Sequence, residues 1–232
     1  FFDGFRTSHE IQKIEVWDYD DLKEMTDMEA VKAFRAHALN PENPAMRGSH
    51  ENGDIFFQHR EACNKFYEAV PGIVEKYMGK VNAKLGTNYQ LFEYYGAPDA
   101  DRVILAMGSI CAVAEEVMDY LTAKGEKVGL VKVRLYRPFA ADRLIAAIPS
   151  TVKSISVLDR TKEPGAFGEP LFLDVVAALK GTQFANVPVY GGRYGLGSRD
   201  TTPAQIIAVY KNGETGAKER FTIGIEDDVT FL

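Results

Sequence analysis

The sequence predicts a doubly wound α/β domain with a mostly parallel sheet over residues 96–232, preceded by a helical connecting segment. Three observations support this fold class. In the second half, short β-branched runs alternate with amphipathic helical runs, which indicates repeated βαβ units. Glycine or proline stands where several of these helices are expected to begin or end. The first half instead shows mainly helical periodicity.

The second half opens with a strand and a helix that set its pattern. RVILAM (102–107) has the composition of a buried strand, and SICAVAEEVMDYLTAKG (109–125) follows as an amphipathic helix that Gly125 stops. The residues expected to face inward on this helix are Ile110, Val113, Ala114, Val117 and Leu121. Further strands are expected at 127–133, 154–159, 187–192 and 220–225.

Three more helices are expected between these strands. Pro138 precedes a short helix within 137–148, and Thr202 with Pro203 gives the N-cap and N1 pair typical of a helix start at 202–213. The third helix lies within 168–181, where Gly181 ends it. Its expected inward residues are Leu171, Val175, Val176 and Leu179. Right-handed crossovers then place helices on both faces of the sheet.

The first half contains two strong helical patterns. MEAVKAFRAHAL (28–39) places Val31, Phe34 and Ala38 on one face. The longer pattern at 56–86 keeps Phe66, Val70, Val74, Tyr77 and Met78 in register. Pro71 interrupts it, so we expect a kink or two consecutive helices there. A polar, turn-rich loop at 40–54 separates the two patterns, and such helices usually bridge or cover domains.

Composition narrows the classes of function. A net charge of −6 argues against general affinity for nucleic-acid backbones. The longest apolar runs fall short of the roughly 18–20 residues that span a bilayer, so no membrane association is expected. The N-terminus lacks the features of a secretory signal. Cys63 and Cys111 lie far apart and form no CxxC, which favours a reducing, cytoplasmic setting without a cysteine-rich metal site.

A glycine turn after the first parallel strand is one candidate anion site. In MGSICAVAEE, Gly108 and Ser109 stand between strand and helix, and the free N–H groups at a helix start can hold an anion. The turn is not GxGxxG, and no acidic residue is suitably placed for a ribose. We therefore favour the interpretation that it is an ordinary strand-to-helix connection.

Two later loops are candidates for an interdomain or anion-binding role. DRTKEPGAFGEP (159–170) carries Arg160, Lys162 and Glu163 after a strand, at the edge of an open α/β sheet where ligands and partners bind. An interdomain or site-facing role and a plain surface loop are equal alternatives for this segment. GGRYGLGSRDTTP (191–203) could form a backbone nest for phosphate or dock on a neighbour. Docking is favoured because no P-loop lysine follows the glycines. The candidate residues of this loop are Arg193, Gly195, Gly197 and Arg199.

The N-terminal stretch FFDGFRTSHE holds a polar cluster. Its candidate residues for a domain junction are Arg6, Thr7, Ser8, His9 and Glu10. His37, His50 and His59 lack such surroundings, and no metal-ligand spacing or GxSxG appears. Cys111, near a helix start, has two interpretations, a thiol with a lowered pKa or a small core residue, of which the second is favoured.

Four segments together resemble pyruvate:ferredoxin (flavodoxin) oxidoreductase: FFDGFRTSHEIQKIE, LFEYYGAPDADRVILAMGSICAVAEEVMDYL, KVGLVKVRLYRPF and LDRTKEPGAFGEPLFLDV. The resemblance covers essentially the whole chain. It implies that residues 1–20 are the tail of an upstream domain like the pyrimidine-binding domain of transketolase. Residues 21–95 would be a helical connector, and residues 96–232 a domain like the C-terminal domain of transketolase. The chain would then be an interior fragment of a longer enzyme.

The resemblance also implies an activity for the parent enzyme. That family oxidatively decarboxylates pyruvate to acetyl-CoA and CO2 and passes electrons to ferredoxin or flavodoxin. It uses thiamine diphosphate, Mg²⁺, [4Fe–4S] clusters and coenzyme A as co-substrate. The CxxC-type cysteine runs of its cluster domains and its GDG…N motif are absent here. We therefore expect no catalytic residue, metal or cofactor within this segment, whose partners are the remaining parent domains in a homodimer.

Two alternatives stay open at this point. The chain is either a scaffold segment of such an enzyme or a stand-alone module that binds a nucleotide or a CoA-like anion through the 108–110 turn and the 191–198 loop. A further alternative, which concerns the substrate, is that the parent enzyme acts on another 2-oxo acid such as 2-oxoglutarate. These residues do not distinguish the two acids.

Overall fold

The protein is described from a computed structural model, which covers residues 9, 11, 13–42, 44, 48 and 50–232. From Ile11 onward the chain divides into two compact units, Ile11–Tyr89 and Gln90–Leu232. Four helices lie in the described part of the first unit, and a six-stranded sheet with four α-helices lies in the second.

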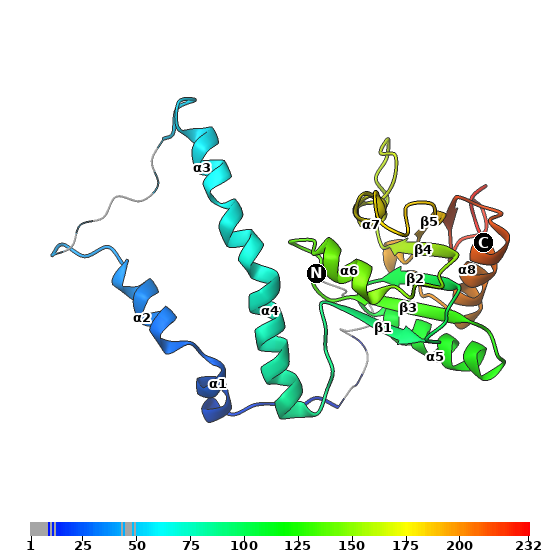
Figure 1. The fold of residues 1–232 in the computed structure, drawn as a ribbon, viewed down its shortest axis with the longest axis horizontal. Coiled ribbons are helices and arrows are strands. Elements are labelled where there is room, and N and C mark those ends of the chain that lie inside the picture. Colours follow the sequence, from blue (N-terminus) through cyan, green and yellow to red (C-terminus); the bar gives the residue numbers. More distant parts are fainter. Residues whose placement is uncertain (1–8, 10, 12, 43, 45–47, 49) are drawn as a thin grey trace. The chain divides into compact units, whose positions relative to one another are not determined.

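The helices of the first unit are α1 (Tyr19–Met25), α2 (Met28–Ala36), α3 (Phe56–Ala62) and α4 (Asn64–Leu85) (Figure 1). Aspartates start the first two, because Asp18 accepts backbone N–H groups at the start of α1 and Asp27 does so for α2. Gly86, at φ 69°, ends α4. No residue within these four helices is buried, so they form no core of their own.

The expected interruption at Pro71 is wrong in its position. Two consecutive helices do occur, but they divide at Cys63, which is both the C-cap of α3 and the N-cap of α4. Pro71 lies inside α4, and the helix continues through it. Proline lacks a backbone N–H donor, so one helical hydrogen bond is missing at Pro71. The helical turns on both sides keep the backbone helical there.

The sheet of the second unit consists of β1 (Phe92–Gly96), β2 (Arg102–Ala106), β3 (Val128–Val133), β4 (Ser154–Asp159), β5 (Val189–Arg193) and β6 (Arg220–Thr222). Its strand order is β1-β3-β2-β4-β5-β6. All neighbours are parallel except β1, which pairs with β3 in the antiparallel direction. The predicted mostly parallel, doubly wound sheet is confirmed, with β1 as an additional edge strand.

Helices cover both faces of this sheet, as Figure 1 shows. They are α5 (Ile110–Ala123), α6 (Ala141–Ala147), α7 (Pro170–Leu179) and α8 (Pro203–Thr215). Helices α5 and α8 pack together on one face, and α6 and α7 on the other. The core beneath α5 and α8 includes Met118 and Tyr210, and the Tyr210 hydroxyl donates to the Gly129 carbonyl at 2.9 Å.

Most helix boundaries follow the expected signals. Gly125 and Gly181, both with positive φ, lie just beyond α5 and α7, and Thr202 caps α8 ahead of Pro203. The five inward residues predicted on α5 are all buried. Val176 is a correction, because its side chain is 41% exposed whereas the other three predicted inward residues of α7 are buried. Helix α7 is apolar around most of its circumference, so periodicity alone does not identify the inner face.

Candidate functional site at the carboxyl edge of the sheet

The sheet reverses its winding direction at β2. The chain leaves β2 for β3 on one side and then returns to add β4 on the other side. In open α/β sheets, ligands and partners meet the carboxyl ends of strands at such a switch point. Gly108 and Ser109 follow β2 there, and Arg160 follows β4. Gly108 has φ 83°, a conformation that favours glycine.

Tyr194 ties the three loops of this edge together. Its backbone N–H donates to the Asp159 carbonyl at 3.2 Å, and its hydroxyl donates to the Met107 carbonyl at 3.2 Å. Arg160 Nε donates to the Gly195 carbonyl at 3.0 Å. The structure therefore brings the loops after β2, β4 and β5 into one hydrogen-bonded assembly.

Asp159, the last residue of β4, acts as a remote cap for α7. Its two carboxylate oxygens accept the backbone N–H groups of Leu171 and Phe172 at 2.9 and 3.0 Å. The N-cap residue of α7, Glu169, makes no side-chain cap bond of its own. Asp159 is 4% exposed, and burial raises its pKa to about 6 although the two N–H bonds act in the opposite direction.

Glu169 lies close to two basic residues, one from the loop after β4 and one from the end of β5. Glu169 is 3% exposed, and its carboxylate has Arg193 Nη1 at 3.7 Å and Lys162 Nζ at 3.9 Å. Arg193 Nη2 also donates to the hydroxyls of Thr222 and Thr230, each at 3.1 Å. Two predicted site residues, Lys162 and Arg193, thus meet at a buried carboxylate that the sequence did not single out. Arg193 thereby links Glu169 to β6 and to Thr230 near the end of the chain.

In the glycine loop after β5, Arg160 occupies the space beside Gly195, whereas the space beside Gly197 is empty. Gly195 and Gly197 both have positive φ, at 69° and 61°. A Cβ on Gly195 would lie 3.0 Å from Arg160 Nε, whereas one on Gly197 would meet nothing within 4 Å. Arg199 is exposed beside it, and Glu163 is exposed on the neighbouring loop. The structure does not bring these last two side chains into the Glu169 cluster.

The remaining predicted candidates fall outside this assembly. Burial raises the pKa of Cys111 to about 12, which agrees with the favoured interpretation as a packing residue. His9 lies exposed in a turn, and Arg6, Thr7, Ser8 and Glu10 lie outside the described residues.

The described residues contain no group of three or more His, Cys, Asp or Glu side chains arranged to hold a metal ion. Among them there is also no helix long and apolar enough to cross a membrane.

Sequence reasoning missed Asp159, Glu169 and Tyr194. Asp159 had one available signal, since it is an acidic residue at the end of a predicted buried strand. Tyr194 offered none, because its hydroxyl bonds to Met107, 87 positions earlier. Glu169 precedes a proline at a helix start, which suggests a local cap. Its carboxylate instead lies near the guanidinium of Arg193, 24 positions later in the sequence.

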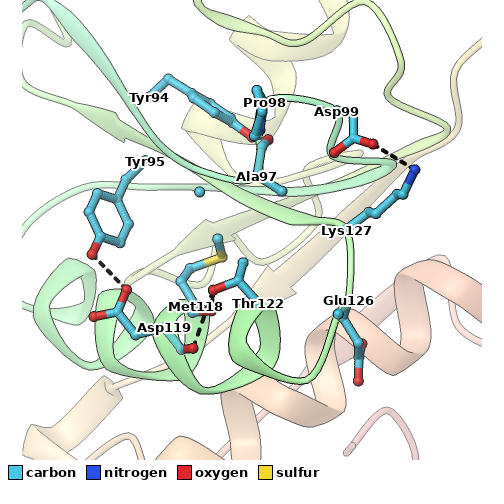
Figure 2. A pocket seen from close by; sticks show the side chains of 12 residues that line it. Tyr94, Tyr95, Ala97, Pro98, Asp99, Met118, Asp119, Thr122, Glu126 and Lys127 are labelled. Carbon is cyan, nitrogen blue, oxygen red and sulfur yellow. Dashed lines mark hydrogen bonds and ion pairs between the residues drawn. The ribbon is translucent and has the colours of Figure 1, made fainter.

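A hollow lies near the amino end of β3, away from this assembly (Figure 2). Its volume is about 710 Å³, and β1, the C-terminal part of α5 and their following loops line it. Charged and polar groups around it pair with one another: the Tyr95 hydroxyl donates to Asp119 at 2.7 Å, and Lys127 lies 2.6 Å from Asp99. These pairs leave the hollow without an evident ligand chemistry.

Two family models match the chain. Residues 1–79 match the model described as "Pyruvate flavodoxin/ferredoxin oxidoreductase, thiamine diP-bdg". Residues 100–206, which include β2 to the start of α8, match "Pyruvate:ferredoxin oxidoreductase core domain II". A solved 2-oxoglutarate:ferredoxin oxidoreductase from Magnetococcus marinus, with 2-oxoglutarate, coenzyme A and succinyl-CoA bound, is 23% identical with a TM-score of 0.38. That likeness covers 61% of this chain and 22% of that chain.

Curated relatives match over the full length of the chain. Pyruvate-flavodoxin oxidoreductase of Enterobacter agglomerans is 54% identical over 232 residues, which are 100% of this chain and 20% of that protein. Pyruvate:ferredoxin oxidoreductase of Moorella thermoacetica is 55% identical over 231 residues, 99% of this chain and 20% of that protein. The chain therefore spans about a fifth of the length of these relatives. With two family models and these identities in agreement, the chain belongs to the pyruvate:ferredoxin (flavodoxin) oxidoreductase family.

Proposed function

We propose that these 232 residues are an interdomain scaffold within a longer enzyme that oxidatively decarboxylates pyruvate to acetyl-CoA and CO2. Electrons would pass to ferredoxin or flavodoxin, the acceptors in the relatives' names. The observation that carries the scaffold role is the assembly at the carboxyl edge. There Tyr194, Arg160 and Asp159 direct their polar groups to other parts of the same unit. The loops are thereby held in one fixed arrangement, as a domain contact requires.

The proposal places the chemistry in other parts of the longer enzyme. Thiamine diphosphate supplies the electron sink for decarboxylation when it is bound, and the description of the family model at residues 1–79 supports its presence in the parent. Mg²⁺, [4Fe–4S] clusters and a coenzyme A site belong to the same proposal, as do a homodimeric parent and a cytoplasmic location. The residues described here would hold domains in position.

Activity measurements test the scaffold proposal. The 232-residue chain is assayed for pyruvate-dependent viologen reduction with thiamine diphosphate, Mg²⁺ and coenzyme A. A chimera, in which it replaces the matching segment of the Moorella thermoacetica enzyme, is assayed in parallel. We expect reduction by the chimera alone, because only the chimera contains the remaining domains. Turnover by the isolated chain contradicts a purely structural role.

A stand-alone module for a CoA-like anion is the second candidate. The open space at Gly197 and the exposed Arg199 beside it favour this candidate. Calorimetric titration of the chain with coenzyme A separates the two functions. The scaffold proposal expects no saturable heat, whereas saturable heat that Arg199→Ala abolishes favours the anion-binding module.

A further inference from the structure

The loop between β4 and α7 presents an exposed aromatic ring. Phe167 is 84% exposed, and Figure 1 shows this loop standing out from the sheet beside α7. A single exposed apolar side chain is ordinary on a protein surface. The contacts beneath Phe167 distinguish it from such a residue.

Arg220 holds the backbone beneath this ring. Its Nη2 donates to the Phe167 carbonyl at 3.0 Å, although Arg220 lies 53 positions later, in β6. Its guanidinium carbon lies 3.7 Å from the centre of the Phe172 ring and 5.3 Å from that of Phe167. A Cβ on Gly168 would lie 2.5 Å from the Phe172 ring, so the loop rests directly on buried Phe172. Phe167 is therefore an exposed ring on a supported loop.

Arg220 itself has no carboxylate partner in the part of the chain that the structure describes. Its guanidinium is half-buried, and its one hydrogen bond there is to the Phe167 carbonyl. Burial lowers its pKa, and Glu169 and Glu219 act on it only through longer-range attraction. A guanidinium has five N–H donors, and removing it from water without an anion is unfavourable. An exposed ring and an incompletely paired cation thus lie side by side.

We propose that Phe167 and Arg220 form a docking point for another domain of the longer enzyme, which supplies an apolar pocket for the ring and a carboxylate for the guanidinium. This inference rests on the proposed function. The chain spans about 20% of its relatives' length, so most of the parent polypeptide is available to supply this surface. The supported loop reduces the entropy lost on docking, and aromatic and arginine side chains are the residues that most often dominate interface energies.

A second copy of this chain fits the docking point less well. A two-fold contact centred there would bring two Arg220 side chains toward each other, and the repulsion of like charges opposes such a contact. A small anion would satisfy Arg220 and leave the Phe167 ring exposed. A protein surface with an acidic group beside an apolar pocket satisfies both.

Thermal unfolding and hydrogen exchange test the docking point in two proteins, the 232-residue chain and the Moorella thermoacetica chimera. In the isolated chain, we expect Phe167→Ala to leave the unfolding midpoint nearly unchanged, because the ring is already exposed. In the chimera, exchange at 160–169 should be slower than in the isolated chain. Phe167→Ala should remove at least half of that protection, and Phe167→Leu should retain more of it.

Tyr120→Ala is the matched control. Like Phe167, Tyr120 on α5 is an exposed aromatic residue next to a cation. Lys124 Nζ lies 4.1 Å from the centre of its ring. This change should leave exchange at 160–169 unaltered in both proteins. Equal exchange at 160–169 in the isolated chain and in an active chimera overturns the docking point and leaves the proposed function standing. A dimer of the isolated chain that Phe167→Ala dissociates also overturns it, because the occupant is then a second copy. An inactive chimera that retains the Phe167-dependent protection contradicts the proposed function alone.

Discussion

At the scale of single residues, Asp159 shows how a buried carboxyl group is used for structure. It ends β4 and accepts two N–H groups from the first turn of α7, where the positive end of the helix dipole favours a negative charge. Burial nevertheless dominates and raises its pKa to about 6. The ionised form present at neutral pH is therefore less favourable in the folded protein than in the unfolded chain.

Asp159→Asn should change the pH dependence of stability. The folded-state pKa of about 6 lies above the ordinary value of 3.8, so folded protein binds more protons between these values. The stabilising contribution of Asp159 to the free energy of unfolding is therefore fully present below about pH 4 and is lost as the pH rises through about 6. Relative to wild type, the variant should gain up to about 3 kcal/mol in free energy of unfolding between pH 4 and pH 7.

Urea unfolding across that pH range measures this difference. The asparagine also loses one of the two acceptor oxygens, which adds an offset that does not depend on pH. A difference between variant and wild type that stays constant from pH 4 to pH 7 would show that Asp159 titrates in the same way in both states.

At the scale of elements, β5 is a strand with two adjacent glycines. Gly191 and Gly192 stand in its middle, where a Cβ on Gly191 would lie 3.1 Å from the Phe172 ring. A Cβ on Gly192 would overlap the ring of Phe221 and approach Leu158 at 2.6 Å. Aromatic rings of α7 and β6 therefore pack against bare backbone.

Gly192→Ala should destabilise the sheet unit by about 1–3 kcal/mol, because the added methyl group overlaps buried groups that have little room to move. Thermal unfolding followed by near-ultraviolet circular dichroism measures the loss. Gly79→Ala is the matched control, since a Cβ there meets nothing within 4 Å in α4 and alanine favours helix. Equal midpoints for the two variants would rule out the overlap as the cause.

Elements with local signals could be predicted from the sequence. The parallel strands and the ends of α5, α7 and α8 follow from β-branched runs, glycines and a threonine cap. The short edge strand β1, FEYYG, has the aromatic content of a strand, but nothing local indicates its antiparallel pairing with β3, about 40 residues later. The predicted helix break at Pro71 was wrong because the proline's local disfavour for helix does not outweigh the helical turns on both sides of it.

The candidate site could be predicted only in outline. The sequence identified the loop with Gly108 as a helix start, the loop with Arg160 by the rule that ligands and partners meet the carboxyl ends of strands, and the loop with Gly195 by its glycines. The structure brings these three loops together. Tyr194, which joins these loops, bonds to a carbonyl 87 positions earlier in the sequence. Long-range bonds of this kind leave no periodic trace in one sequence.

At the scale of the whole molecule, the two units differ in how they are stabilised. The sheet unit has a continuous core, whereas no residue within α1–α4 is buried. Phe66 on α4 and Phe34 on α2 are both largely exposed. Short helices without tertiary packing are marginally stable in water.

Amide hydrogen exchange on the 232-residue chain should show this contrast. We expect the amides of α1, α2 and α3 to exchange rapidly and those of β2, β3 and β4 to exchange slowly. Only the three strands lie in a buried core, so their amides exchange only after the core opens. Mass spectrometry of peptic peptides after labelling measures both in one sample. Protection of α2 and α3 equal to that of β4 would contradict marginal stability of the helical unit.

The glycine–aromatic contacts have a consequence for how this sequence can diverge. Gly192 lies against Phe221, Gly168 against Phe172 and Gly129 against Tyr94, so each small residue has a specific large neighbour. A side chain gained at one member requires volume lost at the other. Among related proteins we therefore expect these positions to vary as pairs, with a smaller residue replacing the ring wherever the glycine is lost.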